Sequence, residues 1–282
     1  MGARARRGGA GGGRVSSVTV AGRRVELTRI GSGEPMLYLH GLADVHSALP
    51  PDPPTRLLHG LAGSAAVVAP ALPGYAGSDS LGPRADVEDH AFHLVDLLDE
   101  IGIGPVDVVG ASFGGWLAAE FALRHPTRVR RLVLAAPLGL HVRDAPGVLF
   151  FGAAAPRGIG GFGEVRGVLF ADPDGPVALD ALPDELPRER ALRWFGGLGG
   201  AAALGWRAPQ LCDPKLADRL DRIGMPTLVV WGAGDRIAPV GQATAWARGL
   251  PDARLEVVDG AGHALSLEEP DRLADLVRDF LH

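Results

Sequence analysis

Short apolar runs, each followed directly by glycine or another turn-forming residue, constrain the fold of this chain more than any other feature. Six such runs occupy residues 35–39, 65–69, 105–109, 129–135, 226–231 and 254–258. Runs of this length between turn formers are typical of strands that are buried on both faces of a sheet. Between them, the apolar residues of 86–101 recur at helical spacing, and 116–124 is a further helix candidate. Alternating strands and helices predict a layered α/β fold, with a mostly parallel central sheet flanked by helices.

The alternation stops between residues 140 and 217. This block contains glycine clusters, several prolines and scattered large apolar side chains, and no strand pattern stands out in it. The rhythm resumes after it with the last two apolar runs. The sequence therefore predicts an α/β core formed by 18–139 and 218–282, with 140–217 inserted as a helical lid over one edge of the sheet.

The two ends of the chain carry different patterns. Residues 1–17 are rich in arginine and glycine, cannot bury enough apolar surface to order themselves, and are predicted to be a disordered tail. Residues 17–20 and 24–28 flank an Ala-Gly turn and predict a hairpin. At the other end, 270–281 has the pattern of an amphipathic helix.

Charge and composition narrow the classes of function. The net charge of −5 gives no reason to expect nucleic acid or an anionic membrane as a partner, and no apolar stretch reaches the roughly 18 residues of a membrane span. The single cysteine, Cys212, excludes an intrachain disulfide and favours the cytosol. Histidines and carboxylates lack metal-ligand spacing, and no phosphate-binding loop follows a strand. The sequence thus predicts a soluble, cytoplasmic protein that binds a small-molecule substrate without metal or cofactor, and a homodimer is compatible with it.

The stretch Gly-Ala-Ser-Phe-Gly at residues 110–114 carries the strongest chemical signal. It follows a predicted strand and opens a predicted helix, which is the context of the strand–turn–helix corner that displays a nucleophilic serine. Glycine is expected at positions 110 and 114 because a sharp turn crowds the strand against the helix and leaves no room for side chains. A strained backbone is expected at Ser112, which would hold its hydroxyl above the sheet.

A serine hydroxyl needs a base, and the base needs a carboxylate that fixes its tautomer. His263 follows the last predicted strand and Asp235 follows the one before it, so both lie at the sheet edge where ligands bind. Asp259 is too close to His263 along the chain, and Asp79 reads as a turn former. The predicted helix 86–101 carries His90 and His93, and His125 precedes a helix-stopping proline. No supporting motif surrounds His46, His59, His141 or His282. The predicted triad is Ser112, Asp235 and His263.

Acyl transfer also needs donors for a developing oxyanion. The backbone N–H of Phe113 at the helix start is one candidate, and the N–H of Leu42, in the loop after residues 35–39, is the second. His40 precedes a glycine turn and is expected to hydrogen-bond this loop as a scaffold. His40 and Trp206 are also retained as candidate substrate contacts.

Six segments carry a family likeness: LYLHG, APALPGYAGSD, DVVGASFGGW, RVRRLVLAAPLGL, PTLVVWGAGDRIAP and VVDGAGHALSLEEP. Together they resemble the lid-containing serine hydrolases of the α/β-hydrolase superfamily, in its esterase and C–C hydrolase branches, over residues 18–281. The resemblance implies the α/β-hydrolase fold and the same triad. Dehalogenases and epoxide hydrolases of this fold carry aspartate at the position of Ser112.

Three functions remain open from the sequence. The first is a serine hydrolase that cleaves an ester-like bond of a small, largely apolar substrate through an acyl-enzyme. The second is hydrolysis of a carbon–carbon bond in a diketone-like substrate, a chemistry of the same superfamily. The third is a non-hydrolytic tailoring, lyase or ligand-binding role on the same fold.

Overall fold

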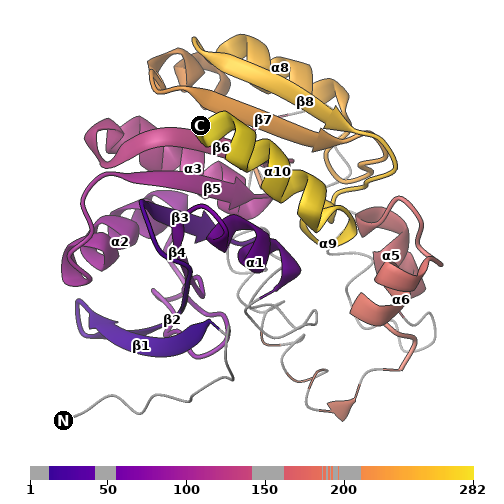
Figure 1. Cartoon of the computed structure of the whole chain (residues 1–282), viewed down its shortest axis with the longest axis horizontal. Helices are drawn as coiled ribbons and strands as arrows, with labels where there is room; N and C mark the ends of the chain where they lie inside the picture. The colour runs from indigo at the N-terminus through magenta and orange to yellow at the C-terminus, as the bar shows by residue number, and fades with distance from the viewer. Residues whose placement is uncertain are drawn as a thin grey trace.

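The computed structural model describes residues 13–41, 55–141, 162–185, 187, 188, 190, 192, 196 and 211–282. Its centre is an eight-stranded sheet with the order β1-β2-β4-β3-β5-β6-β7-β8 (Figure 1). The strands are β1 Arg14–Val20, β2 Arg23–Ile30, β3 Pro35–Leu39, β4 Ala66–Pro70, β5 Val106–Ala111, β6 Val129–Ala135, β7 Thr227–Gly232 and β8 Ala253–Val258. The β1–β2 hairpin joins the sheet antiparallel to β4, and every later pairing is parallel. The layered α/β architecture predicted from the sequence is confirmed.

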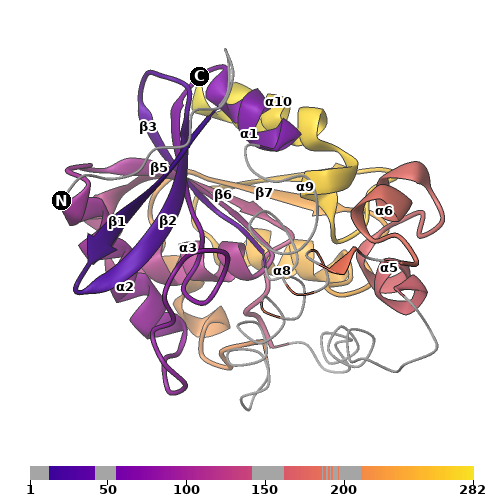
Figure 2. The ribbon, with the colours of Figure 1, turned by 90° about the horizontal axis from the view of Figure 1, so that it is seen from below.

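Helices cover both faces of this sheet (Figure 2). One face carries α1 Arg56–Ala62 and α10 Pro270–Leu281, which pack against each other and are joined by an ion pair between Arg56 and Asp271. The opposite face carries α2 Val87–Glu100, α3 Phe113–Arg124 and α8 Gly241–Gly249. Two buried apolar clusters, one on each face, result from this arrangement.

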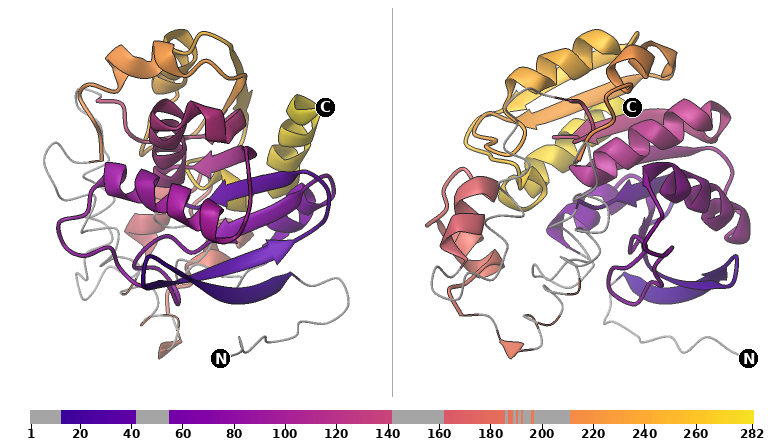
Figure 3. Two further views of the ribbon diagram at one scale, coloured as in Figure 1. Left: turned by 90° about the vertical axis from the view of Figure 1, so that its left-hand side faces the viewer. Right: turned by 180° about the vertical axis from the view of Figure 1, so that it is seen from behind.

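The sheet has two different edges (Figure 3). The β1–β2 hairpin forms one edge and β8 the other, so the parallel strands β3, β5, β6 and β7 are central. Central parallel strands are covered on both faces, which explains why their sequences are nearly continuous apolar runs. Their carboxyl ends all meet at one side of the molecule, where the loops that carry the candidate site lie.

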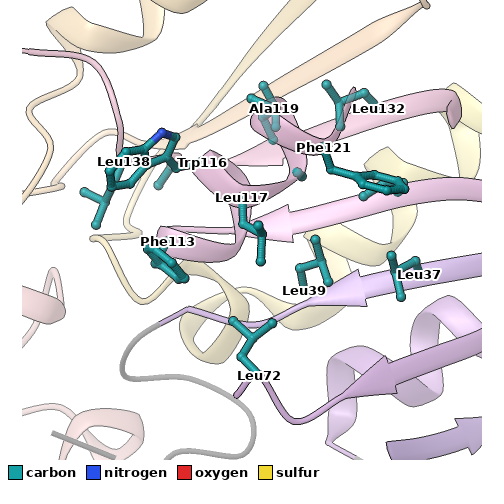
Figure 4. Close-up of a cluster of buried hydrophobic side chains, with 14 of the residues drawn as sticks. Leu37, Leu39, Leu72, Phe113, Trp116, Leu117, Ala119, Phe121, Leu132 and Leu138 are labelled. Carbon is teal, nitrogen blue, oxygen red and sulfur yellow. The ribbon is translucent and has the colours of Figure 1, made fainter. Parts of the chain in front are cut away.

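The helix α3 occupies the middle of one cluster (Figure 4). Phe113, Leu117 and Phe121 are fully buried on it, close to Leu39 of β3. Its one buried charge, Glu120, accepts a hydrogen bond from Trp116 Nε1 at 3.1 Å and pairs with Arg124 one turn on. A helix that is apolar nearly all round must lie inside the protein, and this burial fixes its first turn, where the candidate nucleophile sits.

The segment between β6 and β7 contains two short helices, α5 Gly163–Leu169 and α6 Pro176–Ala181. Both lie beyond the carboxyl ends of the strands, next to the short helix α9 Leu265–Glu268 (Figure 1). The 3₁₀ turns Pro126–Arg128 and Ala217–Arg222 precede β6 and β7. Whether 140–217 acts as one lid remains a prediction.

Two differences from the sequence prediction have simple physical causes. β1 begins at Arg14, so residues 14–17 of the expected disordered tail belong to the hairpin, where Arg14 pairs with Arg29 across from it. A strand that pairs along its whole length is stabilised by the ladder, whatever its composition. The helices α1 and α8 were missed because prolines precede the first and glycines bound the second.

Candidate active site

Ser112 occupies the corner between β5 and α3 in a conformation that non-glycine residues rarely adopt. Its backbone angles are φ 53° and ψ −117°, so the strain expected from the sequence is present. Neighbouring strands hold it there: the Ser112 N–H donates to Ala135 O at 2.8 Å, and Leu138 N donates to Ser112 O at 3.1 Å. The corner is therefore held by β6 and the loop after it, in addition to β5 and α3, which it connects.

The two flanking glycines are required by close backbone packing. A Cβ placed on Gly110 would lie 2.7 Å from the carbonyl carbon of Gly114. One placed on Gly114 would lie 2.5 Å from His40 O and would meet Leu39 O as well. Real Cβ atoms do not approach backbone atoms this closely, so the helix can start directly above the strand only without side chains here.

Replacing Gly114 by alanine is expected to lower the free energy of unfolding by about 3 kcal/mol, at the upper end of the usual overpacking range. Neither partner of the new methyl group is a flexible side chain that could move aside. Urea unfolding of the purified variant measures the effect. Gly104→Ala is the matched control, because its Cβ would meet no atom within 4 Å, and it should stay within about 0.5 kcal/mol of wild type. Equal stability of the two variants would contradict the packing argument.

The structure brings Ser112, His263 and Asp235 into one hydrogen-bonded chain. Ser112 Oγ lies 2.7 Å from His263 Nε2, and His263 Nδ1 lies 2.8 Å from Asp235 Oδ2. A carboxylate only accepts hydrogen bonds, so Nδ1 carries the proton and Nε2 is left to accept the serine hydroxyl. Both distances, from nucleophile to base and from base to orienting carboxylate, are thus within hydrogen-bond reach without movement.

Asp235 is itself held by the backbone. Its second oxygen, Oδ1, accepts hydrogen bonds from Ile237 N and Ala238 N, both at 2.8 Å. The carboxyl group is buried, with 6% of the residue exposed, and His263 is 8% exposed. Each oxygen therefore has its own partner, which leaves a single orientation of the carboxylate toward the imidazole.

The two alternative acidic residues, Asp79 and Asp259, lie at other positions in the fold. Asp79 Oδ2 accepts a hydrogen bond from Arg24 N at 2.7 Å and closes a turn onto β2. Asp259 is exposed in the turn after β8. Among the remaining histidines, His90 is paired through Nδ1 with Asp86 O on α2. The geometry therefore favours the same three residues as the chain order did.

Of the two predicted oxyanion donors, the structure describes only Phe113. Phe113 is the first residue of α3, and its backbone N–H has no acceptor inside the helix, where the dipole favours negative charge. Leu42 and Trp206, predicted as second donor and substrate contact, lie outside the described residues. In the part of the chain that the structure describes, no three His, Cys, Asp or Glu side chains are grouped to hold a metal ion.

His40 is a scaffold residue. It is fully buried, its Nδ1–H donates to Gly41 O at 2.6 Å, and its Nε2 accepts a hydrogen bond from Leu72 N at 2.9 Å. Burial lowers the pKa of His40 to about 4, although the bond to Gly41 opposes the shift. Both ring nitrogens have backbone partners, which supports the expected scaffold role of His40, and its role as a substrate contact stays a prediction.

The low pKa of His40 predicts an acid-sensitive fold. Between pH 6.5 and 4 the unfolded chain binds a proton at His40 that the folded protein does not, so stability falls as the pH falls through this window. The loss attributable to His40 is about 3 kcal/mol. The stability difference between wild type and His40→Gln, measured by urea unfolding, should therefore narrow by that amount from pH 7 to pH 4. A constant difference would show that His40 is not the titrating group.

Sequence reasoning missed two residues that hold the loops of the site. Glu268 accepts a hydrogen bond from Gly262 N at 2.7 Å, directly before His263. Arg236, directly after Asp235, donates to the carbonyls of Gly167, Phe170 and Ala171. The available signal was a carboxylate five residues after the histidine, on a short helix that is otherwise mostly buried.

An eight-stranded α/β sheet, with a serine at a strained strand–helix corner and a histidine and carboxylate on later loops, defines the class of α/β-fold hydrolases. The sequence model described as "Alpha/beta hydrolase family" matches residues 36–276, and the chain belongs to this family. The family resemblance and the fold class expected from the sequence are thereby confirmed.

Two relatives of the chain are named as a hydrolase and an esterase. The chain is 32% identical over 274 residues to 2-hydroxymuconate semialdehyde hydrolase of Pseudomonas putida, covering 94% of this chain and 92% of that one. It is 33% identical over 257 residues to pimeloyl-(acyl-carrier protein) methyl ester esterase of Aromatoleum aromaticum, covering 87% and 97%. The solved meta-cleavage product hydrolase of Pseudomonas fluorescens IP01 shares the fold, with a TM-score of 0.77, 22% identity and coverage of 94% and 96%. The protein is an α/β-fold hydrolase.

Proposed function

We propose that this hydrolase cleaves an ester-like bond of a small, largely apolar substrate through an acyl-enzyme on Ser112. The observation that carries the proposal is the continuous chain from Ser112 Oγ to His263 Nε2 and from His263 Nδ1 to Asp235 Oδ2, at 2.7 and 2.8 Å. The positive φ of Ser112 supports it independently, because backbone strain of this kind concentrates at functional sites.

The geometry suggests one sequence of steps. Ser112 Oγ attacks the carbonyl carbon while its proton passes to His263 Nε2, and Asp235 stabilises the imidazolium that forms. The Phe113 N–H, with the Leu42 N–H as second donor, would bind the oxyanion. Collapse of the tetrahedral intermediate transfers the proton from His263 to the leaving alcohol. A water molecule that gives its proton to His263 then attacks the acyl-serine, and His263 returns that proton to Ser112 Oγ as the acid is released.

The apolar character of the substrate is inferred from the surroundings of the corner. Leu138 and Trp116 lie beside the start of α3 (Figure 4), and both are buried. Both belong to the buried apolar cluster on this face of the sheet, and neither brings a charged side chain to the corner. Apolar surroundings with a few directed polar groups are typical of sites for small, largely apolar ligands.

The experiment that tests the proposal is pre-steady-state hydrolysis of a short-chain p-nitrophenyl ester. The wild-type protein should release a burst of about one equivalent of p-nitrophenol, because acylation precedes a slower release of the acid. A fluorophosphonate should modify Ser112 stoichiometrically, as read by mass spectrometry of the intact protein and its peptides. Ligand binding without burst and without covalent adduct would favour a non-hydrolytic protein on this fold.

Hydrolysis of a carbon–carbon bond is the second candidate, favoured by the 32% identity to 2-hydroxymuconate semialdehyde hydrolase. The same serine, base and carboxylate would serve it, so the site geometry does not separate the two reactions. Turnover of a vinylogous diketone and of matched esters by the same preparation decides between them. A kcat/KM for the diketone above that for every ester would replace the first candidate by the second.

A further inference from the structure

A carboxylate outside the three-residue chain bridges two separate parts of the protein. Glu268, at the end of α9, accepts a hydrogen bond from Gly262 N at 2.7 Å through Oε2. Its other oxygen, Oε1, accepts from Ala171 N at 2.6 Å. Gly262 belongs to the loop of His263, whereas Ala171 follows α5 in the segment between β6 and β7. One side chain thus joins the loop of the candidate base to the inserted segment.

Further contacts secure the same junction. Ala264 N, directly after His263, donates to Leu169 O at 2.8 Å. A Cβ placed on Gly262 would lie 2.7 Å from Ala171 N and 2.8 Å from Leu169 O, so the two backbones touch. His263 is therefore flanked on both sides by residues that rest on segment 169–171.

The loop of Asp235 rests on this segment too. The guanidinium of Arg236 donates to Gly167 O at 2.7 Å, Phe170 O at 3.0 Å and Ala171 O at 3.2 Å. Segment 169–171 consequently contacts the residues next to both His263 and Asp235. Since the Nδ1–Oδ2 bond between those two is 2.8 Å, a shift of either loop changes it directly.

We propose that Glu268 is a positioning residue, which clamps the loop of His263 onto segment 169–171 and so keeps the imidazole within reach of Ser112. This inference rests on the proposed function, since it concerns the activation of Ser112 by His263. It also assigns the inserted segment a part in forming the site, because one partner of the clamp is the backbone of Ala171.

The chemistry of the clamp requires a carboxylate. Two N–H donors point at the two oxygens, and a carboxylate accepts at both oxygens, whereas an amide has an acceptor at only one of these positions. Burial raises the pKa of Glu268, while the two backbone donors oppose the shift by stabilising the charge. Glutamine fills the same space, but its NH₂ group meets one of the N–H groups and loses that bond. Glu268→Gln therefore opens one half of the clamp with little change in volume.

The test is the kinetics of Ser112 modification by a fluorophosphonate, followed by intact mass at increasing reagent concentration. In Glu268→Gln the rate constant at saturating reagent should fall about tenfold, since a displacement of about 1 Å at a catalytic group can cost up to 100-fold. The half-saturating concentration should change less than twofold. Glu269→Gln is the matched control, because that neighbour makes no side-chain cap to α10, and it should be modified at the wild-type rate.

A second pair of variants keeps the proposal testable if Glu268→Gln does not fold. Gly262→Ala should push segment 169–171 away and slow modification at least tenfold, whereas Gly104→Ala, whose Cβ would meet nothing within 4 Å and which lies outside this junction, should not. A wild-type protein that the reagent leaves unmodified would refute the proposed function itself. A wild type that is modified, with Glu268→Gln and Gly262→Ala reacting equally fast, would overturn only the clamp. Slower modification that merely follows a lower folded fraction, measured by circular dichroism, would also overturn it.

Discussion

Ser112→Ala is expected to lower kcat for ester hydrolysis by about a million-fold, the scale seen when the nucleophile of such a site is removed. The methyl group of alanine cannot attack a carbonyl, and no other described hydroxyl shares the hydrogen bond to His263 Nε2. The burst of p-nitrophenol and the fluorophosphonate adduct should both disappear. Steady-state hydrolysis and intact mass of the same preparation measure these outcomes.

The fold of this variant should be intact, which makes the result interpretable. The corner is held by backbone hydrogen bonds to Ala135 and from Leu138, and neither involves the serine side chain. Thermal unfolding of Ser112→Ala should therefore occur within a few degrees of wild type. Ser17→Ala, in β1, provides the same chemical change far from the corner and should keep full activity. An active Ser112→Ala enzyme would refute the proposed function.

Asp235→Asn is expected to lower kcat by about 10⁴-fold while leaving the fold unchanged. The asparagine oxygen should take the place of Oδ1 and accept from Ile237 N and Ala238 N, which directs the NH₂ group at His263. Both His263 Nδ1–H and that NH₂ group are donors, so the imidazole must move its proton to Nε2. A protonated Nε2 cannot accept the proton of Ser112.

The kinetic signature of this tautomer change is separable from a loss of binding. The fall should appear in kcat, with KM for a p-nitrophenyl ester changed less than about threefold, because Asp235 reaches the substrate only through His263. Asp259→Asn is the matched control, since Asp259 is the nearest acidic alternative in the chain and is exposed. Greater damage from Asp259→Asn than from Asp235→Asn would reverse the assignment of the carboxylate.

The central strands and the C-terminal helix could be predicted from the sequence because local and global signals agree there. The strand β6 and the helix α10 have the predicted boundaries. A continuous apolar run predicts the buried strand, and amphipathic spacing predicts the helix, and both patterns are local in the sequence. The helix α8 was missed because its residues, GQATAWARG, have weak apolar periodicity. It is stabilised by packing on β7 and β8, which no local pattern reveals.

The residues of the site likewise fall into some that the sequence could place and one that it could not. Ser112, Asp235 and His263 could be placed together because each follows a strand and parallel strands end at one edge; their catalytic roles remain a prediction. Glu268 has one local signal, its place five residues after His263, but its role was missed because its partner Ala171 lies 97 residues away in a segment without strand pattern. A side chain that binds only backbone leaves no complementary charge elsewhere in the sequence.

The contact between α10 and α1 joins a late segment of the chain to an early one, so it can form only near the end of protein synthesis. At about 5–20 residues per second, Ser112 leaves the ribosome roughly 8 to 30 seconds before His263, which follows 151 residues later. The strands around the serine can pair in that interval, but β8, α9 and α10 are still missing, and with them the imidazole. A nascent chain should therefore be catalytically silent, and product formation in a cell-free translation reaction should begin only once the codons beyond His263 have been read.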